Sequence, residues 1–310
     1  MRSNVLSAVA AGALMVMGGA TALAQDATPV AQNLFEELGL PELTVTVTEE
    51  GFALSETEVA AGRYLVSLND ETGNPDIAAG FVRLVDGKTV DDLSAADEMA
   101  SGTPMPEEGP PPEEFAWLFE TYIAGGVSAS APYAVIDLLG GEYGVWGDDP
   151  TSSIPATGLT VTGDPEAAIE GPAPETTVSI LEEGVGGQGF SFVVEGELQS
   201  GPQIVEIVNN SDQPHFVIAF QYPEEITIEQ AMEFVMFDPS SGATPGPDAL
   251  DETLFSFPGY APVQSAGTTQ WNVFNLGTGQ AILVCFVPDP LAGGIPHAFE
   301  GMVSLVPVAG

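Results

Sequence analysis

The chain has 310 residues, with 45 Asp and Glu against 4 Lys and Arg, and its formal net charge is −41 at neutral pH. From residue 89 to the end there is no Lys or Arg, so nothing there can neutralise phosphates, and binding to nucleic acid or to anionic membranes is excluded as a function. A surface of this charge suits high salt, where counterions screen self-repulsion; the alternative is that acidity keeps an exported chain soluble.

The first 25 residues have the pattern of a secretory signal peptide (1–25). Arg2 provides the positive end, an apolar run extends over residues 5–23, and the sequence "ALA" at 22–24 is a small-residue cleavage signal. Cleavage near Ala24 predicts a secreted, periplasmic or cell-envelope location. An uncleaved membrane anchor is the alternative, because the run is nearly long enough to span a bilayer.

Two parts of the chain repeat the same order of features. Residues 62–93 and 201–232 each hold a Gly, an apolar run, an Asn/Asp turn, an X-Pro-X step and a second apolar run, and each ends in a Thr-led acidic helix start. The match continues between 133–163 and 270–305, with small gaps. The sequence therefore predicts a tandem duplication with a first domain at 40–164, an acidic Pro/Gly linker at 165–174 and a second domain at 175–310.

Each repeat is predicted to be mostly β-structure. In "LTVTVTEEGF", Leu43, Val45 and Val47 alternate with threonines, which is the two-residue period of a half-buried strand. Later runs such as "QIVEIVN", "FVIAF", "WNVFNL" and "AILVCFV" are short and bounded by Gly, Asn or Pro. We expect an all-β fold of two tandem Greek-key β-sandwich domains, each with a short helical insert, at 89–100 and 227–237. The acidic, Pro-rich loop at 104–114 is expected to be solvated.

The only cysteine, the only two histidines and one methionine gather in the second predicted domain. His215 enters a strand after a turn, Cys285 ends the strand "AILVC", and His297 and Met302 lie in the segment that follows. A thiolate, two imidazoles and a weak thioether are the ligand set of a type 1 copper site, because thiolate and imidazole hold both Cu(I) and Cu(II). Taken singly, Cys285 could be a small buried hydrophobe and Met302 a core residue.

This pattern resembles the cupredoxin family, in which one histidine comes from an early strand and Cys, His and Met surround the loop between the last two strands. The spacing here is Cys285-x11-His297-x4-Met302. The loop is longer than in small blue-copper proteins and is nearer to that of copper nitrite reductases, which also place Pro before the His and Gly before the Met, as in "GIPHAFEGM". The resemblance implies one type 1 copper, bound by His215, Cys285, His297 and Met302.

The resemblance also implies a route for electrons. In this family the histidine of the last loop lies near the surface inside an apolar rim, and a redox partner with a basic surface or an apolar patch would dock near His297. The rim would consist of Pro288, Pro290, Leu291, Ile295, Pro296 and Phe299. The alternative is that these residues only pack the loop.

The first repeat serves as an internal comparison, because none of the four ligand residues is present at its aligned positions. The sequence alignment places Asp76, Gly147 (or Trp146), Ala156 and Leu159 at the positions of the four ligands. We therefore expect the first domain to lack copper.

Several other functions are disfavoured by residue counts. Two histidines are too few for a multicopper oxidase or for the second, all-histidine copper of a nitrite reductase. The acidic groups at 148–149, 224–225 and 238 have no EF-hand spacing. The stretch "GVGGQGF" (184–190) has no Lys and is predicted to be a turn, not a phosphate loop. We expect an exported electron carrier and no enzyme. Two alternatives stay open, a copper-sequestering envelope protein and a structural or adhesive β-sandwich protein with a vestigial site.

Overall fold

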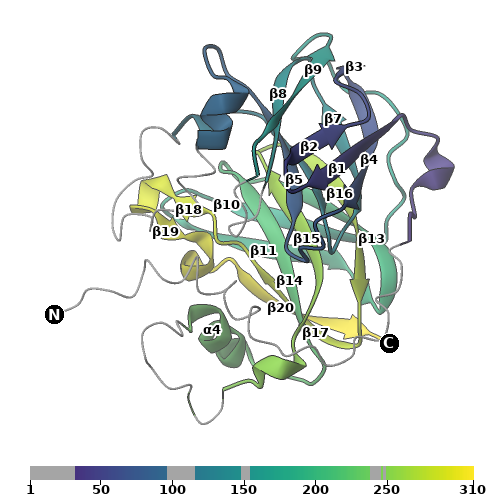
Figure 1. The fold of residues 1–310 in the computed structure, drawn as a ribbon. Helices are drawn as coiled ribbons and strands as arrows, with labels where there is room; N and C mark the ends of the chain where they lie inside the picture. Colours follow the sequence, from purple (N-terminus) through teal and green to yellow (C-terminus); the bar gives the residue numbers. More distant parts are fainter. Residues whose placement is uncertain (1–31, 96–115, 148–153, 238–245, 247–248) are drawn as a thin grey trace.

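The computed structural model describes residues 32–95, 116–147, 154–237, 246 and 249–310, and most of its elements are β-strands (Figure 1). The all-β prediction is confirmed. The predicted signal peptide (1–25) and the acidic loop (104–114) lie outside the described residues, so both stay predictions. Over the described part of the chain, no helix is long and apolar enough to cross a membrane.

The first of two large sheets runs through both halves of the chain, in the order β11-β10-β13-β16-β7-β4-β1-β2. The second half contributes β10 (Val178–Val185), β11 (Gly189–Gly196), β13 (Gly201–Asn209) and β16 (Thr269–Leu276). The first half contributes β1 (Glu42–Thr48), β2 (Gly51–Leu54), β4 (Gly62–Asp70) and β7 (Tyr133–Leu138). The halves meet where β16 pairs antiparallel with β7, with Trp271 opposite Val135.

The second large sheet also crosses both halves, in the order β12-β20-β17-β14-β15-β6-β5-β8-β9-β3. Its strands from the second half are β12 (Leu198–Gln199), β14 (His215–Tyr222), β15 (Ser256–Gln264), β17 (Gly279–Val284) and β20 (Val303–Ala309). Its strands from the first half are β3 (Glu58–Ala60), β5 (Ala78–Arg83), β6 (Ile123–Ser128), β8 (Gly141–Gly147) and β9 (Thr157–Thr162). Here the halves meet where β15 pairs with β6, with Gln264 opposite Ala124.

The helical inserts are short. Helix α4 (Ile228–Met236) lies within the predicted insert at 227–237. It begins after Thr227, whose side chain accepts from the Gln230 N–H while the Gln230 side chain accepts from the Thr227 N–H. In the first half, residues 90–95 are helical. The remaining short turns are 3-10 segments: η2 (Glu36–Leu38), η3 (Trp117–Phe119), η5 (Glu252–Leu254), η6 (Pro290–Ala292) and η7 (His297–Glu300).

An apolar core lies between the two sheets in each half. In β1 the predicted alternation holds, because Leu43, Val45 and Val47 are fully buried while the threonines between them are only partly covered. Burying one such side chain contributes roughly 1.5–3 kcal/mol relative to leaving it exposed. A second core joins β10, β11, β13, β14 and β17 in the other half, and it includes Cys285 and Met302. The second core thus lies directly against the candidate site.

The two halves have the same strand pairing. Strand β1 pairs in parallel with β4 as β10 does with β13, and β3 pairs in parallel with β9 as β12 does with β20. This correspondence supports the predicted duplication and the division into 40–164, 165–174 and 175–310, which both remain predictions.

The junction between the halves, here called the seam, is held by buried polar side chains. The Gln270 side chain accepts from the Gly126 N–H (3.2 Å) and donates to the Pro262 carbonyl (2.8 Å), and Asn272 donates to the Gly126 carbonyl (3.1 Å). Each such bond contributes on the order of 1 kcal/mol net. The halves are therefore joined both by hydrogen bonds between strands and by side-chain hydrogen bonds.

Candidate metal centre

The candidate centre forms where β14 begins and β17 ends. His215 is the first residue of β14 and Cys285 follows the last residue of β17; because these strands are antiparallel neighbours, the two residues come together. The chain then makes a small ribbon, β18 (Pro288–Asp289) paired with β19 (Ile295–Pro296), which returns it to His297 at the start of η7 (Figure 1). The His297 N–H donates to the Val287 carbonyl (2.9 Å), which fixes this return.

Three donor atoms face one another at this point. The two Nδ1 atoms of His215 and His297 are 2.9 Å apart, and the Cys285 Sγ lies 3.6 Å from the first and 3.7 Å from the second. All three side chains are 0% exposed. A triangle with these sides has a circumradius of about 2.0 Å, close to ordinary metal–imidazole bond lengths and slightly inside metal–thiolate ones. Among the described residues, this is the one group of His, Cys, Asp or Glu donors that could hold a metal ion.

The hydrogen bonds of the turn before β14 fix the proton on the outer nitrogen of His215. Asn209 uses its amide group to donate to the Gln213 and Gln264 carbonyls (2.8 and 3.2 Å), so its Oδ1 is an acceptor and takes the Ser211 hydroxyl proton (2.8 Å). We therefore assign the Ser211 Oγ as the acceptor of a hydrogen bond from His215 Nε2, at 2.7 Å. With its proton on Nε2, His215 turns the lone pair of Nδ1 towards the other donors.

A second set of hydrogen bonds does the same for His297. The Gln213 Nε2 donates to a carboxylate oxygen of Asp289 (2.7 Å), so the Gln213 Oε1 is free to accept from His297 Nε2 at 3.1 Å. The proton of His297 therefore also lies on Nε2, and its Nδ1 lone pair faces the Nδ1 lone pair of His215.

The protonation states fit a cation between these atoms. Burial, together with repulsion from His297, lowers the pKa of His215 to about 2, and burial lowers the pKa of His297 to about 3 although the Asp289 charge acts in the opposite sense. Both imidazoles are thus neutral, with two lone pairs aimed at each other beside a sulfur atom. Such a donor set is repulsive by itself and becomes favourable around a metal ion.

Met302 lies next to this group through the main chain. The Cys285 N–H donates to the Met302 carbonyl (3.3 Å), and the Met302 N–H donates to the His297 carbonyl (2.9 Å). Its side chain is fully buried in the same apolar cluster as Cys285. Phe190 covers the histidines, with ring centroids 4.8 Å from His215 and 4.1 Å from His297. The centre is therefore enclosed on its β11 side by an aromatic ring.

The expected apolar rim is only partly present. Leu291 (70% exposed) and Ile295 (37%) lie at the surface of the ligand loop. Pro296 is buried, and the other three rim residues, Pro288, Pro290 and Phe299, are only half-buried. His297 itself has no exposed surface, because Gln213 occupies its outer edge. The expectation of a histidine edge near the surface is therefore wrong for this chain.

The polar residues around the ligands were not singled out by sequence reasoning. Ser211, Gln213 and Asp289 belong to residue types that are common in turns, so their spacing carries no signal. Asp289 is fully buried, yet its pKa is lowered: burial raises it, but hydrogen bonds from the Gln213 side chain and from the N–H groups of Gly187, Leu291 and Ala292 outweigh that. A charged carboxylate is thus held one side chain away from His297.

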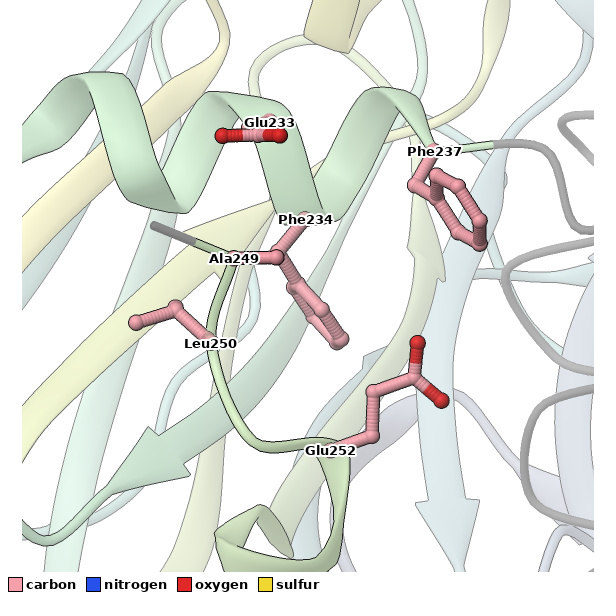
Figure 2. Close-up of a pocket in the computed structure, with 6 residues that line it drawn as sticks. All are labelled: Glu233, Phe234, Phe237, Ala249, Leu250 and Glu252. Carbon is pink, nitrogen blue, oxygen red and sulfur yellow. The ribbon is translucent and has the colours of Figure 1, made fainter. Parts of the chain in front are cut away.

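Other candidate sites are weaker. A hollow beside α4 is lined by Glu233, Phe234, Phe237, Ala249, Leu250 and Glu252 (Figure 2). Its walls are mostly apolar, and one of its two carboxylates already accepts the N–H of Gly246 (3.2 Å). The acidic pair at 148–149 and the single aspartate at 238 lie outside the described residues, and the pair at 224–225 is exposed. The hollow and the exposed acidic pair therefore offer no built metal site.

The fold and the donors together define a class. Two facing sheets with a buried His, Cys, His group between strand ends form a cupredoxin-like architecture, and the group fits one type 1 copper ion. The predicted resemblance is thus confirmed for the fold and for the convergence of His215, Cys285 and His297. The role of Met302 as a ligand stays a prediction.

Among the comparisons with known proteins, matches were found only with solved structures. No protein-family model and no curated protein matches the sequence. Among solved structures the chain is similar to reduced auracyanin from Roseiflexus castenholzii, at 16% identity and TM-score 0.27, over 44% of this chain and 100% of that one. It is also similar to the Cu-containing nitrite reductase of Thermus scotoductus (8%, TM-score 0.24, 86% of this chain and 61% of that one) and to the copper nitrite reductase of Nitrosomonas europaea (10%, 0.23, 87% and 94%). Matches at these identities and scores say nothing about function, which must come from the side chains.

Proposed function

We propose that this protein is an exported electron carrier whose second half holds one type 1 copper through His215, Cys285 and His297, with Met302 as the weak axial ligand. Copper held by a thiolate and two imidazoles is stable as Cu(I) and as Cu(II), so it can store and release one electron. The observation that carries the proposal is the convergence of three buried donors, 2.9–3.7 Å apart.

This arrangement favours electron transfer over loose copper storage. Both tautomers are fixed by the protein's own hydrogen bonds, so the ligands need little rearrangement when a metal binds or changes its charge. A store needs only affinity, whereas a carrier gains speed from ligands that stay in place in both oxidation states.

The same geometry supports a carrier over an enzyme. The three converging side chains have no exposed surface, and the rings are covered by Phe190 and Gln213. The whole sequence contains only two histidines, and both are used here, so a second, all-histidine copper cannot be built from this chain. A substrate would therefore find no open position on the copper.

A partner for the carrier follows from the surface near the site. The exposed side chains of Leu291 and Ile295 stand on the loop that holds His297, on a chain of formal charge −41. We expect the partner to be a redox protein with a basic surface or an apolar patch. The rate of electron exchange should then fall as salt rises, because screening removes the long-range attraction; an exchange rate indifferent to salt would point to apolar docking alone.

The deciding experiment is a copper titration of the chain from residue 26 onwards, followed by visible and EPR spectra. Both halves are kept in this protein because they share both sheets. We expect an intense thiolate-to-copper band at one copper per chain, which the Cys285→Ser variant lacks, and a reversible voltammetric wave. Tight copper binding without reversible oxidation would favour the sequestration alternative. A colourless chain without stoichiometric copper would leave a structural β-sandwich.

A further inference from the structure

The outer edge of His297 is held by a set of residues that the copper ligands alone do not require. Asp289 lies in β18, carries no exposed surface and accepts several hydrogen bonds with its carboxylate. Its Oδ1 takes the Gln213 amide (2.7 Å) and the Leu291 N–H (2.6 Å), and its Oδ2 takes the Gly187 N–H (2.6 Å). A carboxylate bound in this way has one orientation.

The orientation of Asp289 determines that of Gln213. A carboxylate can only accept, so the amide must present its NH₂ group to Asp289 and its oxygen to His297 Nε2, at 3.1 Å. The imidazole then has no choice of tautomer: its proton lies on Nε2, and Nδ1 faces Cys285 Sγ at 3.7 Å. Each of these hydrogen bonds fixes the orientation of the next side chain in the series.

The glycine-rich turn at 184–190 makes room for this series of hydrogen-bonded side chains. A Cβ atom at Gly186 would lie 2.2 Å from the Gln213 Nε2 and 2.8 Å from a Leu291 methyl, and no positive φ is required there. A side chain at Gly186 is therefore excluded by Gln213 and Leu291, and not by the backbone. The turn thus has a structural role around His297, with the N–H of Gly187 completing the Asp289 site.

We propose that Asp289, acting through Gln213, is a positioning residue for His297, which it holds in the Nε2–H tautomer with Nδ1 directed at the copper position. This inference rests on the proposed copper site. The two histidines then differ in kind. The hydrogen bonds of His215 lead to Ser211 and the neutral Asn209, whereas those of His297 lead to a charged carboxylate. A carboxylate partner makes an imidazole a stronger donor to a metal.

The test uses two substitutions of the same residue. Gln213→Met keeps the length of the side chain but removes both hydrogen bonds. Gln213→Glu keeps an oxygen for His297 Nε2 and a protonated carboxyl for Asp289. Gln221→Met is the matched control, because Gln221 is also a buried glutamine with two short bonds, to the Gly277 N–H and carbonyl (both 2.5 Å), elsewhere in the same half.

Two measurements are made on each variant of the full chain. The first is the ¹⁵N NMR tautomer state of His297 in the metal-free and Cu(I)-loaded protein, and the second is copper affinity by competition titration. We expect Gln213→Met to show a mixture of tautomers in the metal-free protein and a 10–100-fold loss of copper affinity. Gln213→Glu should keep the Nε2–H tautomer and most of the affinity, and Gln221→Met should change neither.

Several results would overturn the inference. One is a single Nε2–H tautomer for His297 in Gln213→Met; another is an equal loss of affinity in Gln213→Glu or in Gln221→Met, which would show a purely structural effect. If Gln213→Met fails to fold, Gly186→Ala displaces the same amide without replacing it and should give the same tautomer mixture. If the wild-type protein binds no copper, the proposed function fails, but the metal-free tautomer comparison still decides the role of Asp289 and Gln213.

Discussion

A buried carboxyl group near the ligand turn gives a prediction that needs no metal. Glu182 lies in β10 with no exposed surface, and its Oε2 accepts from the Gln264 Nε2 at 2.9 Å. The other oxygens of this pair, Glu182 Oε1 and Gln264 Oε1, are buried and have no hydrogen-bond partner. If the Glu182 carboxyl group is protonated, its Oε1 can donate a hydrogen bond instead of only accepting one. Burial, only partly offset by the Gln264 bond, raises the pKa of Glu182 to about 8.

The sign of the pH effect follows from this shift. The folded protein keeps the proton of Glu182 up to about pH 8, whereas the unfolded chain releases it near the ordinary value of 4.5. The contribution of Glu182 to the free energy of unfolding is therefore fully present below pH 4.5 and is lost as pH rises towards 8, at about 1.4 kcal/mol per unit. Between pH 4.5 and 7 the loss amounts to about 3 kcal/mol.

The substitution Glu182→Gln should remove this loss, because an amide carries no charge and can donate to Gln264 at any pH. We expect its free energy of unfolding, relative to wild type, to rise by about 3 kcal/mol between pH 4.5 and 7 in urea titrations of the metal-free chain. Glu183→Gln is the control: it removes the same charge from the adjacent residue, which points to the other face of β10 and bonds Asn210 at the surface (2.8 Å). A Glu182→Gln difference that is the same at both pH values would refute the reasoning.

Three further predictions concern the centre and the seam. Ser211→Ala removes the acceptor of one imidazole N–H and should lower copper affinity about tenfold in a competition titration; unchanged affinity would contradict the assigned tautomer. Gly125→Ala places a Cβ 2.4 Å from a side-chain oxygen at φ +91° and should cost about 2 kcal/mol or more in thermal unfolding, whereas Gly39→Ala, at φ +62° with nothing within 4 Å, should cost less. Met302→Leu should keep copper but raise its reduction potential in voltammetry, and a loss of copper would mean that the thioether is more than a weak ligand.

The parts of the fold that were predicted have local signals in the sequence. The two-residue alternation over Leu43–Val47 gave β1, and the Thr227–Gln230 capping box matches the start of α4. The sharing of both sheets between the halves could not be predicted in this way. The pairing of Trp271 with Val135 joins strands that are far apart in the sequence. The composition of a strand does not reveal whether it lies at the edge of a sheet or pairs with a strand of the other half.

The candidate site was predictable to the extent that its residue types are rare. The sequence holds one Cys and two His in 310 residues, so the His215, Cys285, His297 group could be predicted from the sequence alone. Gln213 and Asp289 could not, because amides and carboxylates are abundant in an acidic, turn-rich chain. The burial of His297 was missed for the same reason: it depends on the Gln213 side chain, whose direction is set by a tertiary contact.

Strand register identifies the first-half counterparts of the site more closely than the sequence alignment does. In the first half, Gly147 pairs with Ala79. In the second half, Val284 pairs with Ile218, so the next residue, Cys285, lies opposite Val217. Strands β8 and β17 each begin after a two-residue turn, at Gly141 and Gly279, and Gly147 and Cys285 both lie six residues further on, so Gly147 corresponds to Cys285. Two residues before Ala79 lies Ile77, which is thus the counterpart of His215, in place of Asp76. By the same pairing, the counterpart of Met302 is Pro155 and not Leu159.

The counterpart of Glu182 is Val47, since the two carbonyl groups accept equivalent N–H groups, from Asn210 and from Glu71, both at 2.9 Å. Val47 and Ile77 are fully buried in an apolar core, so the same strand arrangement forms without any of the polar groups of the second half. Burying an imidazole or a carboxyl costs free energy that burying a valine or isoleucine does not. The fold therefore does not need the polar cluster around His215, which lowers the stability of the metal-free chain. A cation bound among His215, Cys285 and His297 would offset part of this cost.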